Sequence, residues 1–150
     1  MNFARVLCLV WVLGAASPIA LAAEGNAQAQ DNADAERPYK VVDGHVDRAT
    51  FRGYLYYGDL CLRCHGPDGA GSSYAPSLVN SLKKMDKRQF EETVINGRKN
   101  VTAATENVMP AFGTNIDAVQ HLEEIYAYLK ARSDGVIGRG RPKRIGETDD

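Results

Sequence analysis

The chain has 150 residues, which is enough for one domain and too few for two of ordinary size. Its 18 basic and 19 acidic side chains nearly balance, and this argues against a nucleic-acid-binding role. With three cysteines and three methionines, only a small number of sulfur ligands is available, so their positions carry much of the information.

Residues 1–22 have the layout of a secretory signal peptide. Arg5 supplies the positive charge, residues 6–16 form an apolar run, and Ala-Leu-Ala at residues 20–22 offers a cleavage site. The run is shorter than the ~20 apolar residues that a spanning helix needs. We therefore expect cleavage after Ala22 and a periplasmic protein that does not span the membrane. Cleavage removes Cys8 and Arg5, which changes the formal net charge from −1 to −2.

The first part of the mature chain is polar. Residues 23–37 contain no aliphatic side chain larger than alanine, so we expect a flexible acidic arm there. The domain is predicted to begin at residue 38, with a turn at Asp43-Gly44 between two short β-prone runs. A helix is predicted from Asp47. Gly53 lies inside that helix and requires a packing reason, because glycine weakens helices.

Two further helices follow. Residues 86–96 are predicted to be helical, with Asp86 as the cap and Gly97 as the stop, and residues 97–113 are expected to form a loop. The last helix is predicted to start at a capping box in residues 114–117 and to end at Gly135. Its apolar residues have helical spacing: Leu122, Ile125, Tyr126 and Leu129. No segment alternates long enough for a sheet, so we predict an all-α domain over residues 38–135 and an extended basic and polar tail over residues 136–150.

The central motif is Cys61-x-x-Cys64-His65. Residues three and four apart share one face of a helix, and this five-residue pattern is the attachment signature of c-type haem. A thioredoxin-like redox pair would require a βαβ context. A zinc site would require two more ligands, and His45 and His121, which we expect to be ordinary surface residues, have no paired spacing. The motif and the export signal together predict one covalently attached haem c, with His65 as an iron ligand.

The second axial position determines the kind of function. Met109 lies in a predicted loop and is followed by the rigid Pro110, so we expect its thioether to be the other iron ligand. Met85 is more simply explained as a gap-filling side chain. A His/Met site favours electron transfer, whereas an open position would suit a haem-based ligand sensor or a small haem enzyme. The carbonyl group of Pro76 is the expected acceptor for the other ring nitrogen of His65.

These residues resemble the class I monohaem cytochromes c. The matching features are Gly53, Tyr57, Cys61-x-x-Cys64-His65-Gly66, Pro76, Met109-Pro110 and the helix IYAYLK. The resemblance implies that short helices surround one haem and that the first and last helices cross. It also implies contacts of Gly53 and Tyr57 with Ile125 and Tyr128, which would explain the glycine within a helix.

Residues 38–142 further resemble the methanol-metabolism-related, cytochrome cL-like group, through segments such as YKVVDGHVD, VINGRKN and VMPAFG. The resemblance implies a monomeric electron carrier and not an enzyme. It would accept electrons from a PQQ-dependent alcohol (methanol) dehydrogenase and pass them to a downstream cytochrome or oxidase. Arg98 is the expected partner of a haem propionate, with a solvated charge at a helix end as the alternative. The tail is one candidate docking surface. A second is the basic cluster of Lys83, Lys84, Lys87 and Arg88.

Overall fold

The computed structural model describes residues 37–101 and 106–148, and the chain divides into two units, residues 1–35 and 36–150. The predicted signal peptide and nearly all of the predicted acidic arm lie outside the described residues. Within the described residues, no helix is long and apolar enough to cross a membrane.

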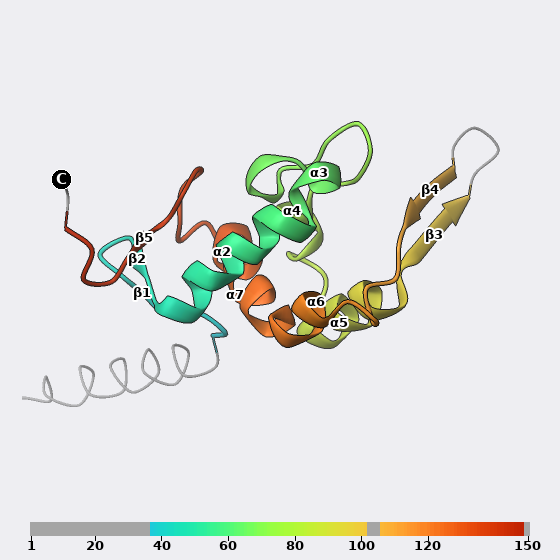
Figure 1. Cartoon of the computed structure of the whole chain (residues 1–150). Coiled ribbons are helices and arrows are strands. Elements are labelled where there is room, and N and C mark those ends of the chain that lie inside the picture. Colours follow the sequence, from blue (N-terminus) through green and yellow to red (C-terminus); the bar gives the residue numbers. More distant parts are fainter. Residues whose placement is uncertain (1–36, 102–105, 149–150) are drawn as a thin grey trace, which may run out of the picture. The chain divides into compact units, whose positions relative to one another are not determined.

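The second unit is mostly helical (Figure 1). Its helices are α2 (Arg48–Leu60), α3 (Leu62–His65), α4 (Leu78–Ser81), α5 (Lys87–Asn96), α6 (Ile116–Gln120) and α7 (Leu122–Ser133), with a short 3-10 turn η1 (Pro67–Gly69). The strands are β1 (Val41–Val42), β2 (His45–Val46), β3 (Arg98–Val101), β4 (Glu106–Met109) and β5 (Lys143–Arg144). The prediction of a helical fold is confirmed, but the expectation that no sheet forms is wrong.

The first predicted turn and the helix caps agree with the structure. Asp43 and Gly44 have φ of 50° and 76° and connect the antiparallel strands β1 and β2. The side chain of Asp47 caps α2 by accepting hydrogen bonds from the backbone amides of Ala49 and Thr50 at 2.8 and 3.0 Å. Asp86 caps α5 in a capping box with Gln89. These short side chains satisfy amide groups that the first helical turn leaves without partners.

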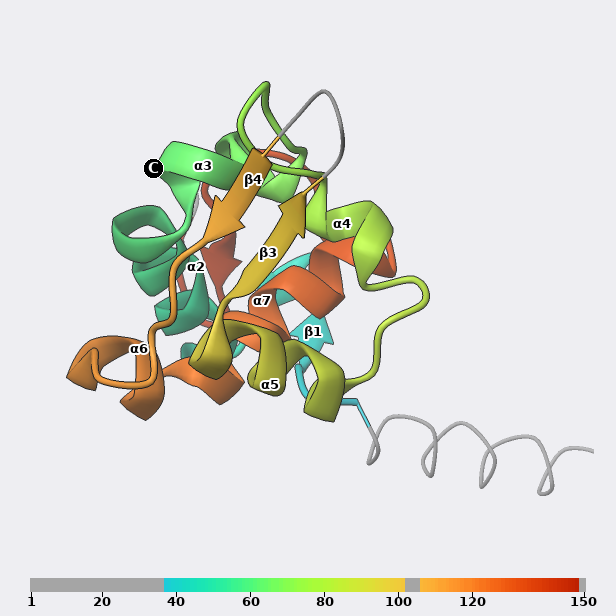
Figure 2. The ribbon, with the colours of Figure 1, turned by 90° about the vertical axis from the view of Figure 1, so that its right-hand side faces the viewer.

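Two predictions along the second half of the chain are wrong. Residues 97–113 are not a simple loop, because β3 and β4 form an antiparallel pair (Figure 2). In its register, Arg98 lies opposite Met109. The last helix is interrupted at His121, which separates α6 from α7. Its cap is Asn115, whose side chain accepts a hydrogen bond from the amide of Ala118 at 2.9 Å, and not the capping box predicted at residues 114–117.

The main helix packing joins α2 to α7. An added Cβ at Gly53 would lie 1.8 Å from the backbone oxygen of Glu124, so only glycine permits this approach. Tyr57 and Tyr128 pack nearby with ring centroids 5.5 Å apart, and both side chains are fully buried. The predicted crossing of the first and last helices is therefore confirmed, and so is the packing reason for Gly53.

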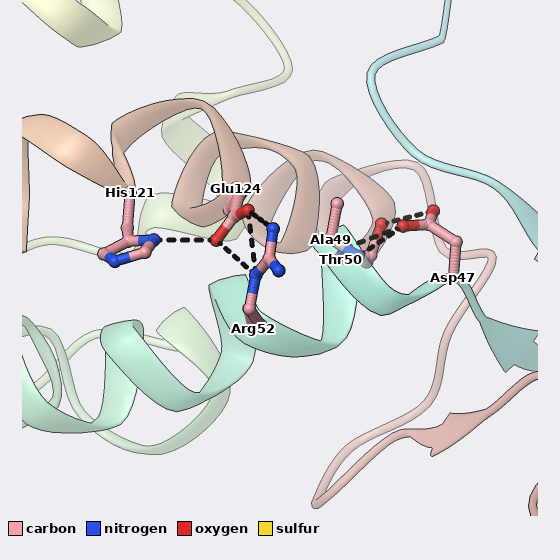
Figure 3. A network of polar contacts seen from close by, with 6 residues as sticks. All are labelled: Asp47, Ala49, Thr50, Arg52, His121 and Glu124. Carbon is pink, nitrogen blue, oxygen red and sulfur yellow. Dashed lines mark hydrogen bonds and ion pairs between the residues drawn. The ribbon is translucent and has the colours of Figure 1, made fainter.

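A polar network joins the same two helices (Figure 3). The carboxylate of Glu124 on α7 accepts hydrogen bonds from the guanidinium group of Arg52 on α2, one of them at 3.0 Å from Nε. It also lies 2.9 Å from Nδ1 of His121, and the ring of His121 stacks on Tyr56 with centroids 3.6 Å apart. His121 is therefore part of the helix interface, and the expectation that it is an ordinary surface residue is wrong.

Replacing Glu124 with glutamine should lower stability by about 1 kcal/mol near neutral pH, since solvent screens the pair. Desolvation raises the pKa of Glu124, but the hydrogen bonds from Arg52 and His121 outweigh this effect. The net result is a pKa below the ordinary value of 4.5. A lowered carboxyl pKa stabilises the fold above the unfolded pKa, and that contribution is lost as the pH falls. Urea unfolding should therefore show the difference between the parent and Glu124→Gln shrinking below about pH 4.5. A difference that is constant with pH would contradict this assignment.

Candidate functional site: a haem cavity

The Cys-x-x-Cys-His motif lies where α2 ends and α3 begins. The amide of His65 donates to the carbonyl oxygen of Cys61 at 2.9 Å, which places the two residues on one helical turn. Gly66 follows with φ of 71°, and a Cβ there would lie 2.3 Å from the carbonyl oxygen of Gly71. The chain therefore reverses tightly after His65, and glycine permits the positive φ and the close approach.

A cavity of about 400 Å³ opens beside the motif. This volume is in the range of small-molecule and cofactor pockets, roughly 300–1,000 Å³. Its walls are mainly apolar, and they bring together every sulfur and nitrogen ligand that the sequence analysis singled out. The lining includes Cys61, Cys64, His65, Pro76, Met85, Arg98 and Met109, with Tyr74, Phe90, Val94, Val108, Phe112 and Leu129 among the apolar and aromatic side chains.

The two cysteines are free thiols in this structure, with Cys61 half-buried and Cys64 exposed. Burial, together with the neighbouring Cys64, raises the pKa of the Cys61 thiol to about 12. Redox-active cysteine pairs instead have a lowered thiol pKa, because the thiolate is the reactive form. The environment of Cys61 therefore argues against the redox-switch alternative.

His65 is buried, and its Nδ1 lies 2.9 Å from the carbonyl oxygen of Pro76. A ring nitrogen that donates to a carbonyl group fixes the tautomer, and it leaves Nε2 as the nitrogen with a free lone pair. These are the two partners expected from the sequence. Its role in orienting an iron ligand stays a prediction, because it depends on the assignment of His65.

Met109 is the last residue of β4, and it also lines the cavity. The segment that follows is held against α5 by hydrogen bonds from the amides of Phe112 and Gly113 to the carbonyl oxygens of Val94 and Ile95, at 2.9 and 3.0 Å. A Cβ at Gly97 would lie 2.6 Å from the backbone oxygen of Met109. Gly97 thus ends α5 and also lets the Met109 segment cross close above it.

Met85 lines the same cavity from the segment between α4 and α5. The cavity lining alone therefore does not distinguish the two thioethers. Met109 differs in that strand pairing on one side and Pro110 on the other restrict its backbone. Arg98 stands opposite Met109 in the hairpin and is the charged residue among the described lining side chains.

Tyr57 has a role at the site that the sequence analysis did not identify. Its buried hydroxyl group donates to the carbonyl oxygen of Gly66 and accepts from the amide of Gly69 at 2.9 Å. Desolvation raises the pKa of Tyr57 to about 12, so the hydroxyl group stays protonated and able to donate. Tyr57 therefore fastens the turn that follows His65 to α2. The sequence shows an aromatic residue four positions before Cys61, but nothing in it reveals the partners of the hydroxyl group.

The residues present fit a haem with two thioether attachments. The residues that line a mainly apolar cavity include two cysteine thiols, an imidazole with its Nδ1 already engaged, and two thioethers. Imidazole and thioether are the axial ligands of electron-carrying c-type haem, and an apolar wall suits the macrocycle.

The comparisons with known proteins agree with this fit. A family model described as cytochrome c oxidase, cbb3-type, subunit III matches residues 49–129. Cytochrome c-553I of Paracoccus denitrificans is 47% identical over 114 residues, which cover 75% of this chain and 50% of that protein. Cytochrome c-555 of Methylococcus capsulatus is 41% identical over 96 residues, which cover 63% of this chain and 72% of that protein.

Among solved structures, the c-type cytochrome XoxG from Methylobacterium extorquens AM1 is similar, with a TM-score of 0.59, 36% identity and 73% coverage of each chain. The matches span more than half of the chain, and together with the fold they show that it belongs to the c-type cytochromes, in the class I monohaem group with covalently attached haem c. The chain spans half of the length of cytochrome c-553I.

Proposed function

We propose that this protein is a periplasmic single-haem electron carrier that accepts electrons from a PQQ-dependent alcohol dehydrogenase, such as a methanol dehydrogenase, and passes them to a downstream cytochrome or oxidase. The observation that carries the proposal is the cavity in which Cys61, Cys64, His65 and Met109 meet. The resemblance to methanol-metabolism-related cytochromes and the match to XoxG support the choice of donor.

Each residue at the cavity has a distinct part in holding the cofactor. The thiols of Cys61 and Cys64 would form the thioether attachments, and Nε2 of His65 and the sulfur of Met109 would hold the iron. The carbonyl group of Pro76 would keep the ring of His65 in one orientation, and Arg98 would pair with a propionate. The haem would supply one-electron oxidation and reduction. With His65 and Met109 both holding the iron, the site would leave no position open for a substrate or a gaseous ligand.

The surface beside the cavity has features suited to a brief encounter with a partner. Tyr74 and Val108 line the cavity and are 75% and 54% exposed. We define the basic rim as Arg63 and Lys84, which are both exposed and directly precede the lining residues Cys64 and Met85 in sequence. Within the described residues, neither of the two forms an ion pair. An acidic surface on the dehydrogenase would complement this rim and steer the encounter.

The basic cluster predicted from the sequence is only partly available. Lys87 pairs with Glu123 at 2.6 Å, and Arg88 pairs with Glu92 at 3.0 Å, so these two cations are locally neutralised. Lys83 and Lys84 are exposed. The basic rim is thus a better candidate for the docking surface than the cluster as a whole, since no ion pair among the described residues involves it and each of its residues directly precedes one that lines the cavity.

Stopped-flow mixing of the oxidised cytochrome with the reduced dehydrogenase tests the donor. We expect the haem to be reduced, and the second-order rate constant to fall as salt is added, because screening weakens steering. The double variant Arg63→Gln/Lys84→Gln should lower that rate by about threefold or more at low salt. Arg88→Gln is the matched control, since Glu92 already neutralises this arginine. If the haem is not reduced at low salt, the dehydrogenase tested is not the donor.

The proposed periplasmic location is tested by a separate experiment. N-terminal sequencing of the protein recovered from the periplasm should begin close to residue 23, within a residue or two. A chain that begins at Met1 in the cytoplasm would contradict it.

A further inference from the structure

The C-terminal segment of residues 137–147, here named the C-terminal strap, is bound to the domain at several points. Strand β5 pairs in parallel with β2, and the amide of Ile145 donates to the carbonyl oxygen of Val46 at 2.9 Å. The guanidinium groups of Arg141 and Arg144 lie 4.8 and 5.1 Å from the ring centroid of Phe51. Figure 1 shows β5 beside β2, at the end of α2 opposite to α3.

The strap also reaches the turn that follows the haem-attachment motif. The carboxylate of Asp68 accepts a hydrogen bond from the amide of Gly140 at 2.9 Å and another from Nε of Arg139 at 3.2 Å. Asp68 is only 9% exposed, although it belongs to a short surface turn. A buried carboxylate needs such partners, because desolvation without them is costly. Asp68 therefore fixes the turn to the strap.

A continuous path of bonded groups leads from Asp68 to His65. The carbonyl oxygen of Gly69, the next residue, accepts a hydrogen bond from the hydroxyl group of Ser77 at 3.2 Å. Ser77 directly follows Pro76, whose carbonyl oxygen lies 2.9 Å from Nδ1 of His65. A Cβ at Gly71 would lie 2.7 Å from the amide nitrogen of Ser77, so the two arms of this loop are in close contact.

We propose that the C-terminal strap, acting through Asp68, positions the carbonyl group of Pro76 against His65 and so influences the reduction potential of the haem. Asp68 and Arg139 are positioning residues, since neither lines the cavity. The inference rests on the proposed function in one respect, namely that His65 is an iron ligand. A firm Nδ1–H···O contact increases the basicity of the imidazole and favours ferric iron. Loosening the contact should therefore raise the reduction potential.

Two variants of the full-length holoprotein test the inference. Asp68→Asn keeps the shape of the side chain and tolerates φ of 60°, which asparagine adopts readily. Arg139→Gln alters a side chain that is 73% exposed, so the fold should not depend on it. Arg141→Gln is the control for removing a positive charge from the same strap, because its guanidinium group contacts Phe51 and Glu147 and has no described bond to Asp68.

The readouts are the reduction potential and the exchange rate of the Nδ1 proton of His65 in the reduced protein, measured by NMR. We expect both variants to shift the redox equilibrium at least threefold toward ferrous haem, or about 28 mV for one electron at 59 mV per tenfold. Proton exchange should also be at least about threefold faster. The control should change neither.

The signs of the two shifts in reduction potential distinguish a positioning role from a direct electrostatic effect of the removed charge. Removing a positive charge at residue 139 would by itself favour ferric haem, whereas removing a negative charge at residue 68 would favour ferrous haem. Shifts of opposite sign, or unchanged potential and exchange with only a lower melting temperature, would overturn the inference. All variants are compared with haem attached. A parent protein that carries no attached haem would contradict the proposed function instead.

Discussion

Replacing Met109 with alanine should lower the reduction potential of the haem, by an amount on the order of 100 mV or more out of the ~0.8 V over which axial ligands act. A thioether ligand stabilises ferrous iron, and alanine cannot replace it. The backbone of residue 109 is held by strand pairing and by the segment bonded to α5, so the loss should be confined to the side chain. Potentiometric titration of the purified protein measures the change.

Met85→Ala is the matched control for this prediction. Met85 lines the same cavity and is also a thioether, so it reports the effect of removing apolar volume without removing the ligand. We expect its potential to stay close to that of the parent. If instead Met85→Ala lowers the potential and Met109→Ala does not, the assignment of the two methionines is reversed.

Replacing Gly53 with alanine should destabilise the protein by about 3 kcal/mol or more, at the upper end of the usual effect of overpacking. The added Cβ would lie 1.8 Å from the backbone oxygen of Glu124 and 3.0 Å from the amide nitrogen of Ile125. Backbone atoms cannot rotate away as a side chain does, so α2 and α7 would have to separate. Urea unfolding of the holoprotein, followed by circular dichroism, measures the loss.

The same helix offers an internal control at Gly58. A Cβ at this position would meet nothing within 4 Å, so alanine is accommodated without strain. Because alanine favours helices over glycine, Gly58→Ala should stabilise the protein by about 0.5–1 kcal/mol. Equal effects of the two substitutions would show that the close helix crossing at Gly53 does not limit stability.

The parts of the fold that were predictable depend on short-range chemistry. Asp47 and Asp86 are short polar side chains ahead of helical runs, and Asp43-Gly44 supplies two positive φ angles in a turn. The Cys61–His65 motif is equally local. Gly53 was predictable only through the family resemblance, because its partner on α7 is about seventy residues away in sequence.

The missed features depend on contacts between distant segments. The β3–β4 hairpin has no alternation of apolar residues that would predict its strands. It begins where the Met109 segment passes close to Gly97. The strap looks like a solvated tail in sequence, yet Asp68, Val46 and Phe51 bind it. His121 was misjudged for the same reason, since its partners Tyr56 and Glu124 belong to two helices. Local sequence patterns carry little information about such pairings.

The near-infrared absorption spectrum of the oxidised, unsubstituted protein tests the central claim most directly, namely that His65 and Met109 close both axial positions of one attached haem. We expect the weak charge-transfer band of methionine-ligated ferric haem, and a reduced protein that does not bind carbon monoxide rapidly. Absence of that band, together with rapid binding of carbon monoxide, would show an open sixth position and would contradict the electron-carrier assignment.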